Sequence, residues 1–142
     1  MTYRTYISWL FSTLVMYTAF YCWHGVILSD FEFISFPFWL FLIASGVAYL
    51  FIGFLIATSY PLFSFGILIY KPRLRGLISG ACCGAVIYFV ALIVGFNFSK
   101  NTNLSGILFD LCWQVSEQAL GGIAVGFAHI FIPEQPIQET EL

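Results

Sequence analysis

The stretch FWLFLIASGVAYLFIGFLIATS (residues 38–59) carries no charged side chain and only a few weakly polar ones. A run of about 20 apolar residues is long enough to cross a lipid bilayer as a helix, so this stretch predicts a membrane span. The apolar sequence continues to residue 70, which is too long for one straight crossing, and Pro61 ends or kinks the helix. We therefore predict a span at residues 38–59. Residues 60–75 would form an interfacial, re-entrant or kinked segment followed by a basic loop.

Composition extends this prediction to the whole chain. Of its 142 residues, 61% are hydrophobic and only 8% are charged, whereas soluble domains carry about 25% charged residues. Three more apolar stretches, residues 6–27, 76–98 and 106–132, complete an all-α integral membrane four-helix bundle within residues 1–132. No cleavage pattern follows the first stretch, so we expect an uncleaved span. Residues 133–142 form a short, acidic tail of disorder-prone composition.

Basic residues predict the orientation of these spans. Lys71, Arg73 and Arg75 lie in KPRLR, on the same predicted side as Arg4, and only Lys100 lies on the other side. Because Lys and Arg are enriched in cytoplasmic loops, we expect both termini and KPRLR in the cytoplasm. The net charge of −2 does not favour a nucleic-acid partner.

Glycines at intervals of four predict where two spans pack together. GLISGACCG contains Gly76, Gly80 and Gly84, and GGIAVG contributes Gly122 and Gly126. Small residues allow close approach of membrane helices. Counted from the cytoplasmic ends at about 1.5 Å per residue, Gly80 is level with Gly126, and Gly84 is level with Gly122. The third and fourth spans are therefore predicted to cross closely in their cytoplasmic halves.

The stretch FDLCWQVSEQALGG (residues 109–122) brings polar side chains into the fourth span. Asp110, Gln114 and Glu117 share a helix face, and Gln118 lies beside it. Glu117 falls about 22 Å from the cytoplasmic end, where an ionised carboxylate is costly unless it is paired or hydrated. It is either a proton or cation site or a protonated group hydrogen-bonded within the bundle, since no Lys or Arg lies at that depth.

Two further residues complete the predicted polar site. Tyr88 lies at a similar depth on the third span and is the predicted hydrogen-bond partner of the buried acid. His24, at the outer end of the first span, lies on the same side as Asp110. The second histidine, His129, is near the opposite end, about 20 Å or more away, so the two cannot share a haem iron. No cofactor or metal is predicted.

The four cysteines do not form a C-x-x-C motif of the kind that redox dithiols use. Two of them are predicted near the outer face, where a disulfide bond would be permitted. Free cysteines usually behave as small apolar residues, and we expect all four to be buried in this way. They are Cys22, Cys82, Cys83 and Cys112.

WHGVILSDF (residues 23–31), the glycine-spaced third span and the pattern D-x-x-W-x-x-x-E-x-x-x-x-G (residues 110–122) together resemble small four-helix bacterial membrane proteins of unassigned function. The resemblance implies a multi-pass protein of the bacterial cytoplasmic (inner) membrane, and it implies no activity. Small multidrug transporters are comparable in size and number of spans. They carry their acidic residue in the first span, whereas YISWLFSTLVMYTAFYCW (residues 6–23) has none.

Three functions fit this pattern. The one we expect is a non-catalytic membrane partner or accessory protein, which uses its glycine and aromatic faces to bind other membrane proteins or a second copy of itself. The alternative is an oligomeric transporter or channel-like protein, in which Glu117, Gln114 and Asp110 line a path from the outer face. An enzyme acting at the outer leaflet, with His24 and Asp110 as acid and base, ranks last because the sequence supplies no nucleophile or metal set.

Overall fold

The computed structural model describes residues 2–29, 31, 37–96 and 103–133, and all regular structure within them is helical, as predicted. A π-helix extends the first α-helix, and two short 3₁₀ helices connect the second and third. The elements in chain order are α1 (Tyr3–Phe20), η1 (Tyr21–Ile27), α2 (Phe38–Ser59), η3 (Tyr60–Phe63), η4 (Gly66–Tyr70), α3 (Pro72–Phe96) and α4 (Leu104–Phe131).

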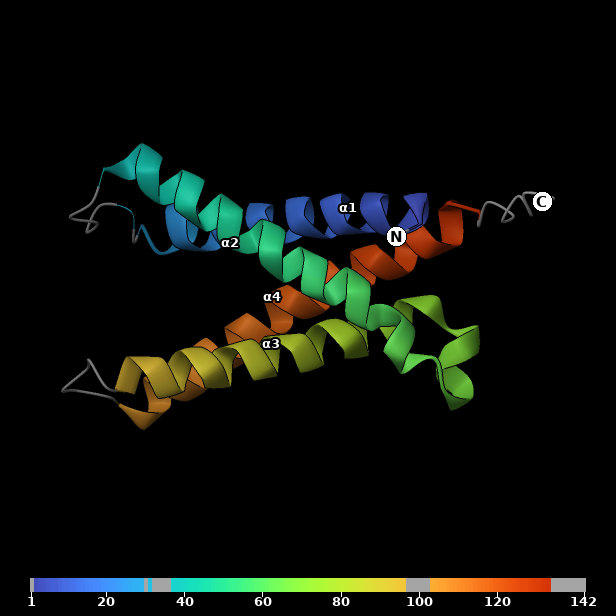
Figure 1. Cartoon of the computed structure of the whole chain (residues 1–142). Helices are drawn as coiled ribbons and strands as arrows, with labels where there is room; N and C mark the ends of the chain where they lie inside the picture. Colours follow the sequence, from blue (N-terminus) through green and yellow to red (C-terminus); the bar gives the residue numbers. More distant parts are fainter. Residues whose placement is uncertain (1, 30, 32–36, 97–102, 134–142) are drawn as a thin grey trace.

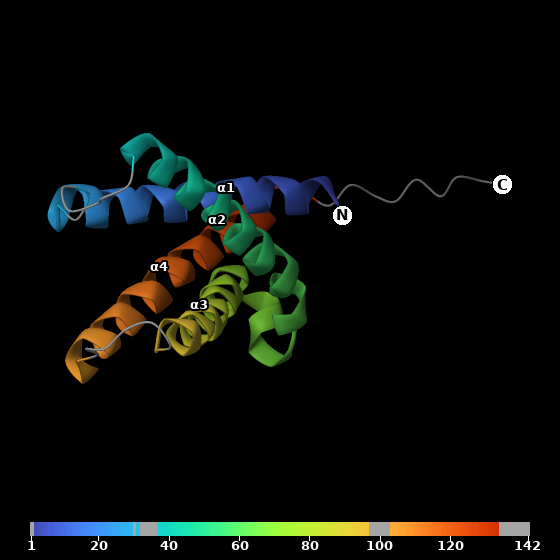
Figure 2. The ribbon, with the colours of Figure 1, turned by 60° about the vertical axis from the view of Figure 1, so that its left-hand side comes forward.

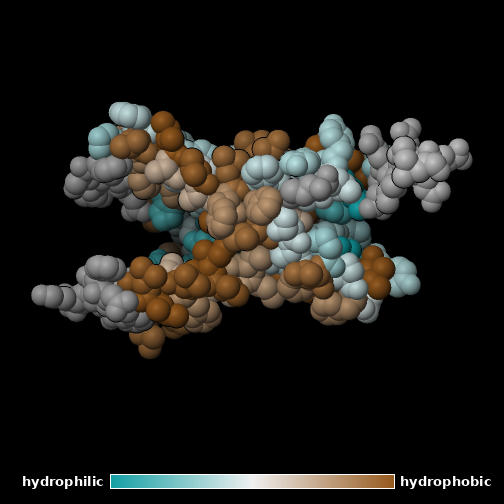
Figure 3. Space-filling model, in the orientation of Figure 1, coloured by the Kyte–Doolittle hydropathy of each residue, from teal (hydrophilic) through white to brown (hydrophobic). Residues whose placement is uncertain are grey.

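The four α-helices alternate in direction, so the start of α1, the end of α4 and the segment between α2 and α3 lie at one end of the molecule (Figure 1). The helix α4 is central, since it packs most extensively on α3 and then on α1, whereas α2 packs mainly on α1. Figure 2 shows α3 and α4 side by side, running obliquely to α1. The α1–α2 and α3–α4 pairs diverge toward the other end, and Figure 3 shows a hollow with hydrophilic residues between them.

Large apolar side chains lie on the outside of this arrangement. Leu14, Phe51 and Ile93, on three different helices, are all well exposed. The inside holds an apolar core that includes Met16, Ile56 and Val125, together with polar groups. The fully buried polar residues are Ser8, Ser12, Ser79, Glu117 and Gln118. A protein in water buries most of its large apolar side chains, so the many exposed ones on these helices are compatible with a lipid environment.

Length and composition identify candidate membrane spans among the described residues. Three helical stretches are long and apolar enough to cross a membrane: Tyr3–Ile27, Phe38–Phe63 and Pro72–Val94. The fourth predicted span, α4, does not reach that hydropathy because it carries polar residues along its length. These residues are Asp110, Gln114, Glu117, Gln118 and His129.

Most helix bounds follow the predicted ranges, with one difference that matters for packing. The helix α2 covers residues 38–59, and Pro61 stands in the 3₁₀ turn that follows. The helix α3 begins at Pro72, one turn before the predicted start at residue 76. Proline suits a first helical position, because its φ is fixed in the helical range and no N–H bond is required there. Arg73 and Arg75 therefore belong to the first turns of α3 and not to a loop.

Three cysteines that we expected to be buried are exposed, namely Cys22, Cys82 and Cys112, and all four are free thiols. A thiol is apolar enough to face lipid, so burial inside the protein is not required of it. The predicted tail, residues 133–142, and the end of the predicted third span, residues 97–98, lie outside the described residues apart from residue 133.

Side chains of α1 form hydrogen bonds with the backbone of α2. The Trp9 indole N–H donates a 2.6 Å hydrogen bond to the carbonyl oxygen of Leu50, and the Tyr17 hydroxyl donates one of 3.0 Å to that of Leu42. Gly53 lets α2 approach Thr13, since a Cβ on this glycine would overlap the threonine hydroxyl. These contacts fix α1 and α2 as one pair, and α4 packs against that pair at its polar residues.

Candidate functional site

The glycine rows bring α3 and α4 into direct backbone contact. A Cβ added to Gly76 would overlap the carbonyl oxygen of Gly122, and a Cβ added to Gly122 would overlap that of Gly76. Gly80 and Gly126 likewise face backbone atoms of the opposite helix. Only glycine allows this separation, so the seam fixes the position of α4 and of the polar residues that it carries.

The register of this seam differs by about two turns from the prediction, in which Gly84 was level with Gly122. The pairs found are Gly76 with Gly122, Gly80 with Gln118, Gly84 with Gln114 and Gly126 with Pro72. The prediction counted depth from residue 76 as the first residue of the helix. Because α3 begins at Pro72, this count misplaces every residue of α3 by about one turn. The other turn arises because Pro72 is level with Gly126, so that α4 continues to Phe131 beyond the start of α3.

Glu117 lies where α1, α2 and α4 meet, and Gln118 beside it lies against Gly80 and Gly84 of α3. Glu117 is 1% exposed, while Gln118 and Ser12 are fully buried. Ser12 reaches α4 from α1, since its Oγ would lie 2.9 Å from a Cβ at Gly121. The Tyr49 hydroxyl approaches the Glu117 carboxyl from α2. Three helices thus contribute polar groups to one enclosed cluster.

Much of the hydrogen-bonding capacity of this cluster is unused. Within the described residues, Glu117 Oε1, the Oε1 and Nε2 atoms of Gln118, Ser12 Oγ and Trp113 Nε1 are buried without a hydrogen-bond partner. Each such atom costs about 1–3 kcal/mol. Native proteins keep few of them, and those that persist usually have a functional or structural reason. The cluster is therefore the candidate functional site.

The polar face of α4 becomes more enclosed along the helix. Asp110 is exposed, Gln114 is half-buried and Glu117 is enclosed. Beside this face, a shallow pocket of about 210 Å³ is lined by residues of η1 and α4, including Trp23 and Ser116. The predicted face is thus a graded series that begins at the exposed N-terminal part of α4 and ends in the cluster.

Tyr88 does not take the predicted place beside Glu117. Its hydroxyl donates a 2.7 Å hydrogen bond to the Ile107 carbonyl oxygen, near the start of α4. Tyr49 lies beside Glu117 instead, and this residue was not predicted from the sequence. The available signal was that Tyr49 is the single tyrosine in the apolar stretch 38–59 and lies near its middle.

His24, in η1, belongs to an aromatic cluster with residues of α1 and α4. Its ring centroid lies 5.2 Å from that of Phe20 and 6.5 Å from that of Trp113, and Trp113 stacks on Trp23 at 4.1 Å. These ring contacts place His24 against α1 and α4, and its predicted pairing with Asp110 stays a prediction.

Comparison with known proteins gives no relative: no protein-family model, curated protein or solved structure matches the chain. The fold and composition define the class on their own, as an all-helical protein whose described residues include three candidate membrane-spanning helices.

Proposed function

We propose that the chain is a multi-pass protein of the bacterial cytoplasmic (inner) membrane, in which α4 crosses as a fourth span. The low hydropathy of α4 is compatible with crossing because its polar residues Glu117 and Gln118 are turned into the bundle. Leu108, Leu120 and Ile130 are exposed on the same helix and would face lipid. Acidic residues in membrane helices are tolerated when they face the interior in this way.

Both termini lie on the cytoplasmic side in this proposal. The start of α1, the end of α4 and the basic residues Lys71, Arg73 and Arg75 lie at one end of the molecule, which fits the enrichment of positive charge in cytoplasmic segments (Figure 1). Reporter fusions test this topology. Alkaline phosphatase should be active when fused after residue 103 and inactive when fused after residue 133. The same activity at both positions would mean that α4 does not cross.

For the activity, we propose a non-catalytic membrane partner or accessory protein. The observation that carries this proposal is the enclosure of Glu117 at 1% exposure, with its polar neighbours directed inward. The surface left for recognition is apolar and aromatic, and on α3 it includes Val86, Phe89 and Val90. Such a surface suits contact with another membrane helix.

In-cell photo-crosslinking tests the partner proposal. A photoreactive residue at Val90 on α3 should give one protein adduct of defined mass, whereas the same residue at Leu14, exposed on α1, serves as a position control. Glu117→Gln should leave the Val90 adduct unchanged. Lipid adducts alone at both positions would contradict the proposal.

The second candidate is an oligomeric transporter or channel-like protein that uses Glu117 as a proton or cation site. The unpartnered atoms of Glu117, Gln118 and Ser12 favour it, because buried oxygens can bind a cation. The hydrophilic hollow between the helix pairs also favours it (Figure 3). Vesicles containing the purified protein should then release a proton or cation gradient faster than empty vesicles, and Glu117→Gln should abolish the difference. Equal release rates would eliminate this candidate.

A further inference from the structure

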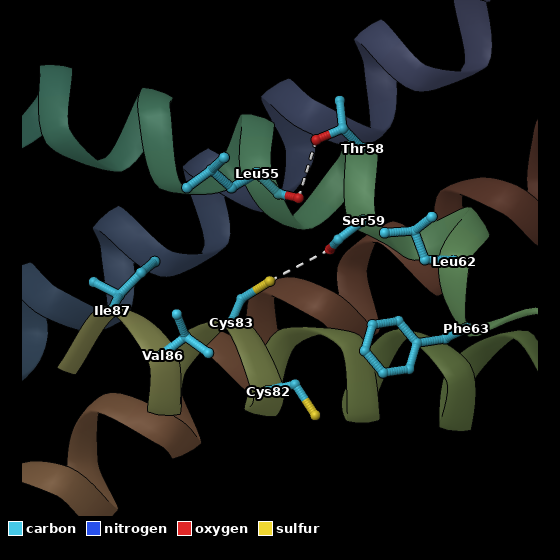
Figure 4. Close-up of a pocket in the computed structure, with 9 residues that line it drawn as sticks. All are labelled: Leu55, Thr58, Ser59, Leu62, Phe63, Cys82, Cys83, Val86 and Ile87. Atoms are coloured by element: carbon cyan, nitrogen blue, oxygen red, sulfur yellow. Dashed lines mark hydrogen bonds between the residues drawn. The ribbon is translucent and has the colours of Figure 1, made fainter. Parts of the chain in front are cut away.

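A groove lies on the outer surface of the molecule, between α2 and α3. It has a volume of about 380 Å³. Figure 4 shows the side chains that line it from both walls, most of them apolar apart from the hydroxyl groups of Thr58 and Ser59. Its walls include Leu55, Leu62 and Phe63 on the side of α2 and η3, and Cys82, Val86 and Ile87 on α3.

The groove exists because α2 and α3 hardly pack on each other. The helix α2 packs mainly on α1, and α3 packs mainly on α4. Where α2 and α3 do approach, the contact is made by small side chains. The Ser59 hydroxyl lies 2.9 Å from the Ser79 hydroxyl and 3.3 Å from the Cys83 sulfur. These hydrogen bonds satisfy the polar atoms beside the groove, so the rest of the groove surface is apolar.

Positive charge lies at the cytoplasmic end of the same α3 face. Arg75 and Ser79 are one turn apart, and Cys82 and Val86 continue the same row toward the groove. Arg75 lies about 10 Å along the helix axis from Cys82. Lys71, one turn before Arg75, is exposed.

The guanidinium of Arg75 is held in a fixed position. Its Nε donates a 2.9 Å hydrogen bond to the Tyr60 carbonyl oxygen, and the group lies 3.9 Å from the centroid of the Tyr60 ring. Tyr60 precedes Leu62 and Phe63 in η3, so the charge is attached to the element that closes this end of the groove. The planar guanidinium is well suited to binding phosphate.

The segment beside this charge has the character of a membrane interface. Leu62 is 77% exposed and Tyr70 is 83% exposed, and Ile67 between them is also exposed. Apolar and aromatic side chains adjacent to lysine and arginine are typical of segments at the level of lipid headgroups.

We propose that the groove binds one anionic phospholipid, with an acyl chain between α2 and α3 and the phosphate beside Lys71 and Arg75. Positive charge at the end of an apolar groove favours an anionic lipid over an apolar helix of a partner protein, because the cytoplasmic leaflet is rich in anionic lipid. This inference rests on the proposed membrane location and orientation, which the reporter fusions test separately.

Native mass spectrometry of the full-length protein tests the binding. Delipidated protein in a neutral detergent is titrated with phosphatidylglycerol and, in parallel, with phosphatidylcholine. One phosphatidylglycerol should be retained per chain, in preference to phosphatidylcholine. Cys82→Trp fills the groove and should remove the retained lipid, whereas Val90→Trp, on α3 outside the groove lining, should keep it. Equal lipid retention by these two variants, with both folded by circular dichroism, would overturn the proposal.

A matched pair of charge variants tests where the headgroup lies. Lys71→Gln should lower the preference for phosphatidylglycerol about fivefold, the usual effect of one basic residue at a membrane surface. Arg73→Gln removes the same charge, but Arg73 lies over the Phe127 ring of α4, 4.5 Å from its centroid. It should leave the preference unchanged. If both variants lower the preference for phosphatidylglycerol equally, the lipid responds to a diffuse surface charge and not to a headgroup site. If the protein without lipid is a dimer that Cys82→Trp dissociates, a second copy of the chain occupies the groove.

Discussion

Gly76 of α3 and Gly122 of α4 face each other backbone to backbone, and a Cβ on either one would overlap the carbonyl oxygen of the other. No rotation of a side chain can relieve such an overlap, because both colliding groups belong to the backbone. Since α4 carries Glu117 and Gln118, this contact determines where the buried polar cluster stands relative to the other helices.

Gly122→Ala should therefore destabilise the protein. The two helices must separate to admit the methyl group, and overpacking of this kind lowers the free energy of unfolding by about 1–3 kcal/mol. Thermal unfolding in detergent measures the change. Gly106→Ala on the same helix is the control, because a Cβ there meets nothing within 4 Å. Equal stability of the two variants would argue against the seam.

Two serine variants compare the effect on stability of a hydroxyl group that has a hydrogen-bond partner with that of one that has none. Ser59→Ala removes the 2.9 Å bond to Ser79 and leaves that buried hydroxyl without its partner, at a cost of about 1–3 kcal/mol. Ser12→Ala removes a buried hydroxyl that has no partner among the described residues, so stability should stay unchanged or rise. Chemical denaturation in mixed micelles compares them. A large loss for Ser12→Ala would show that its hydroxyl is bound in the folded protein.

Trp9→Phe should loosen the α1–α2 pair without opening a large cavity. The change keeps an aromatic ring but removes the N–H that bonds to the Leu50 carbonyl oxygen at 2.6 Å. A bond of this type contributes about 0.5–1.5 kcal/mol, and the melting temperature should fall accordingly. Trp39→Phe changes a residue that is 63% exposed and should have little effect. A similar fall in both variants would assign the effect to general aromatic packing.

Gly66→Ala should strain the connection between η3 and η4. Gly66 has a φ of 54°, and a Cβ there would meet no atom within 4 Å, so any penalty comes from the backbone conformation alone. An L-residue in this region costs about 1–2 kcal/mol. The melting temperature in detergent reports the loss, which an unchanged value would contradict.

Local signals made the helices predictable. Hydropathy and Pro61 were enough to bound α2 at residues 38–59, because both act within a few residues of the chain. The start of α3 was missed by one turn because Pro72 was read as part of a loop, although proline is common at a first helical position. That shift accounts for about one turn of the wrong register of the glycine seam, and the extension of α4 beyond the start of α3 accounts for the other.

The partner of Glu117 could not be read from the sequence. Tyr88 and Tyr49 both lie at a suitable depth, and the choice between them depends on the rotation of α2 and α3 about their axes. The helix α2 is apolar on every side, so it has no polar stripe that would reveal its rotation. The π-helix η1, in which the Leu28 N–H bonds to the Trp23 carbonyl oxygen at 2.9 Å, likewise had no signal in the sequence.

The central position of α4 has a consequence for biosynthesis. Chains are made from the N-terminus, so α1, α2 and α3 leave the ribosome before the helix on which two of them pack. Each of these three is long and apolar enough to cross a membrane. If α4 crosses as proposed, its acid and amides can enter only where Gly76 and Gly80 of α3 and Ser12 of α1 are already in place to pack against it. Assembly of the bundle and insertion of its last helix would then be a single event.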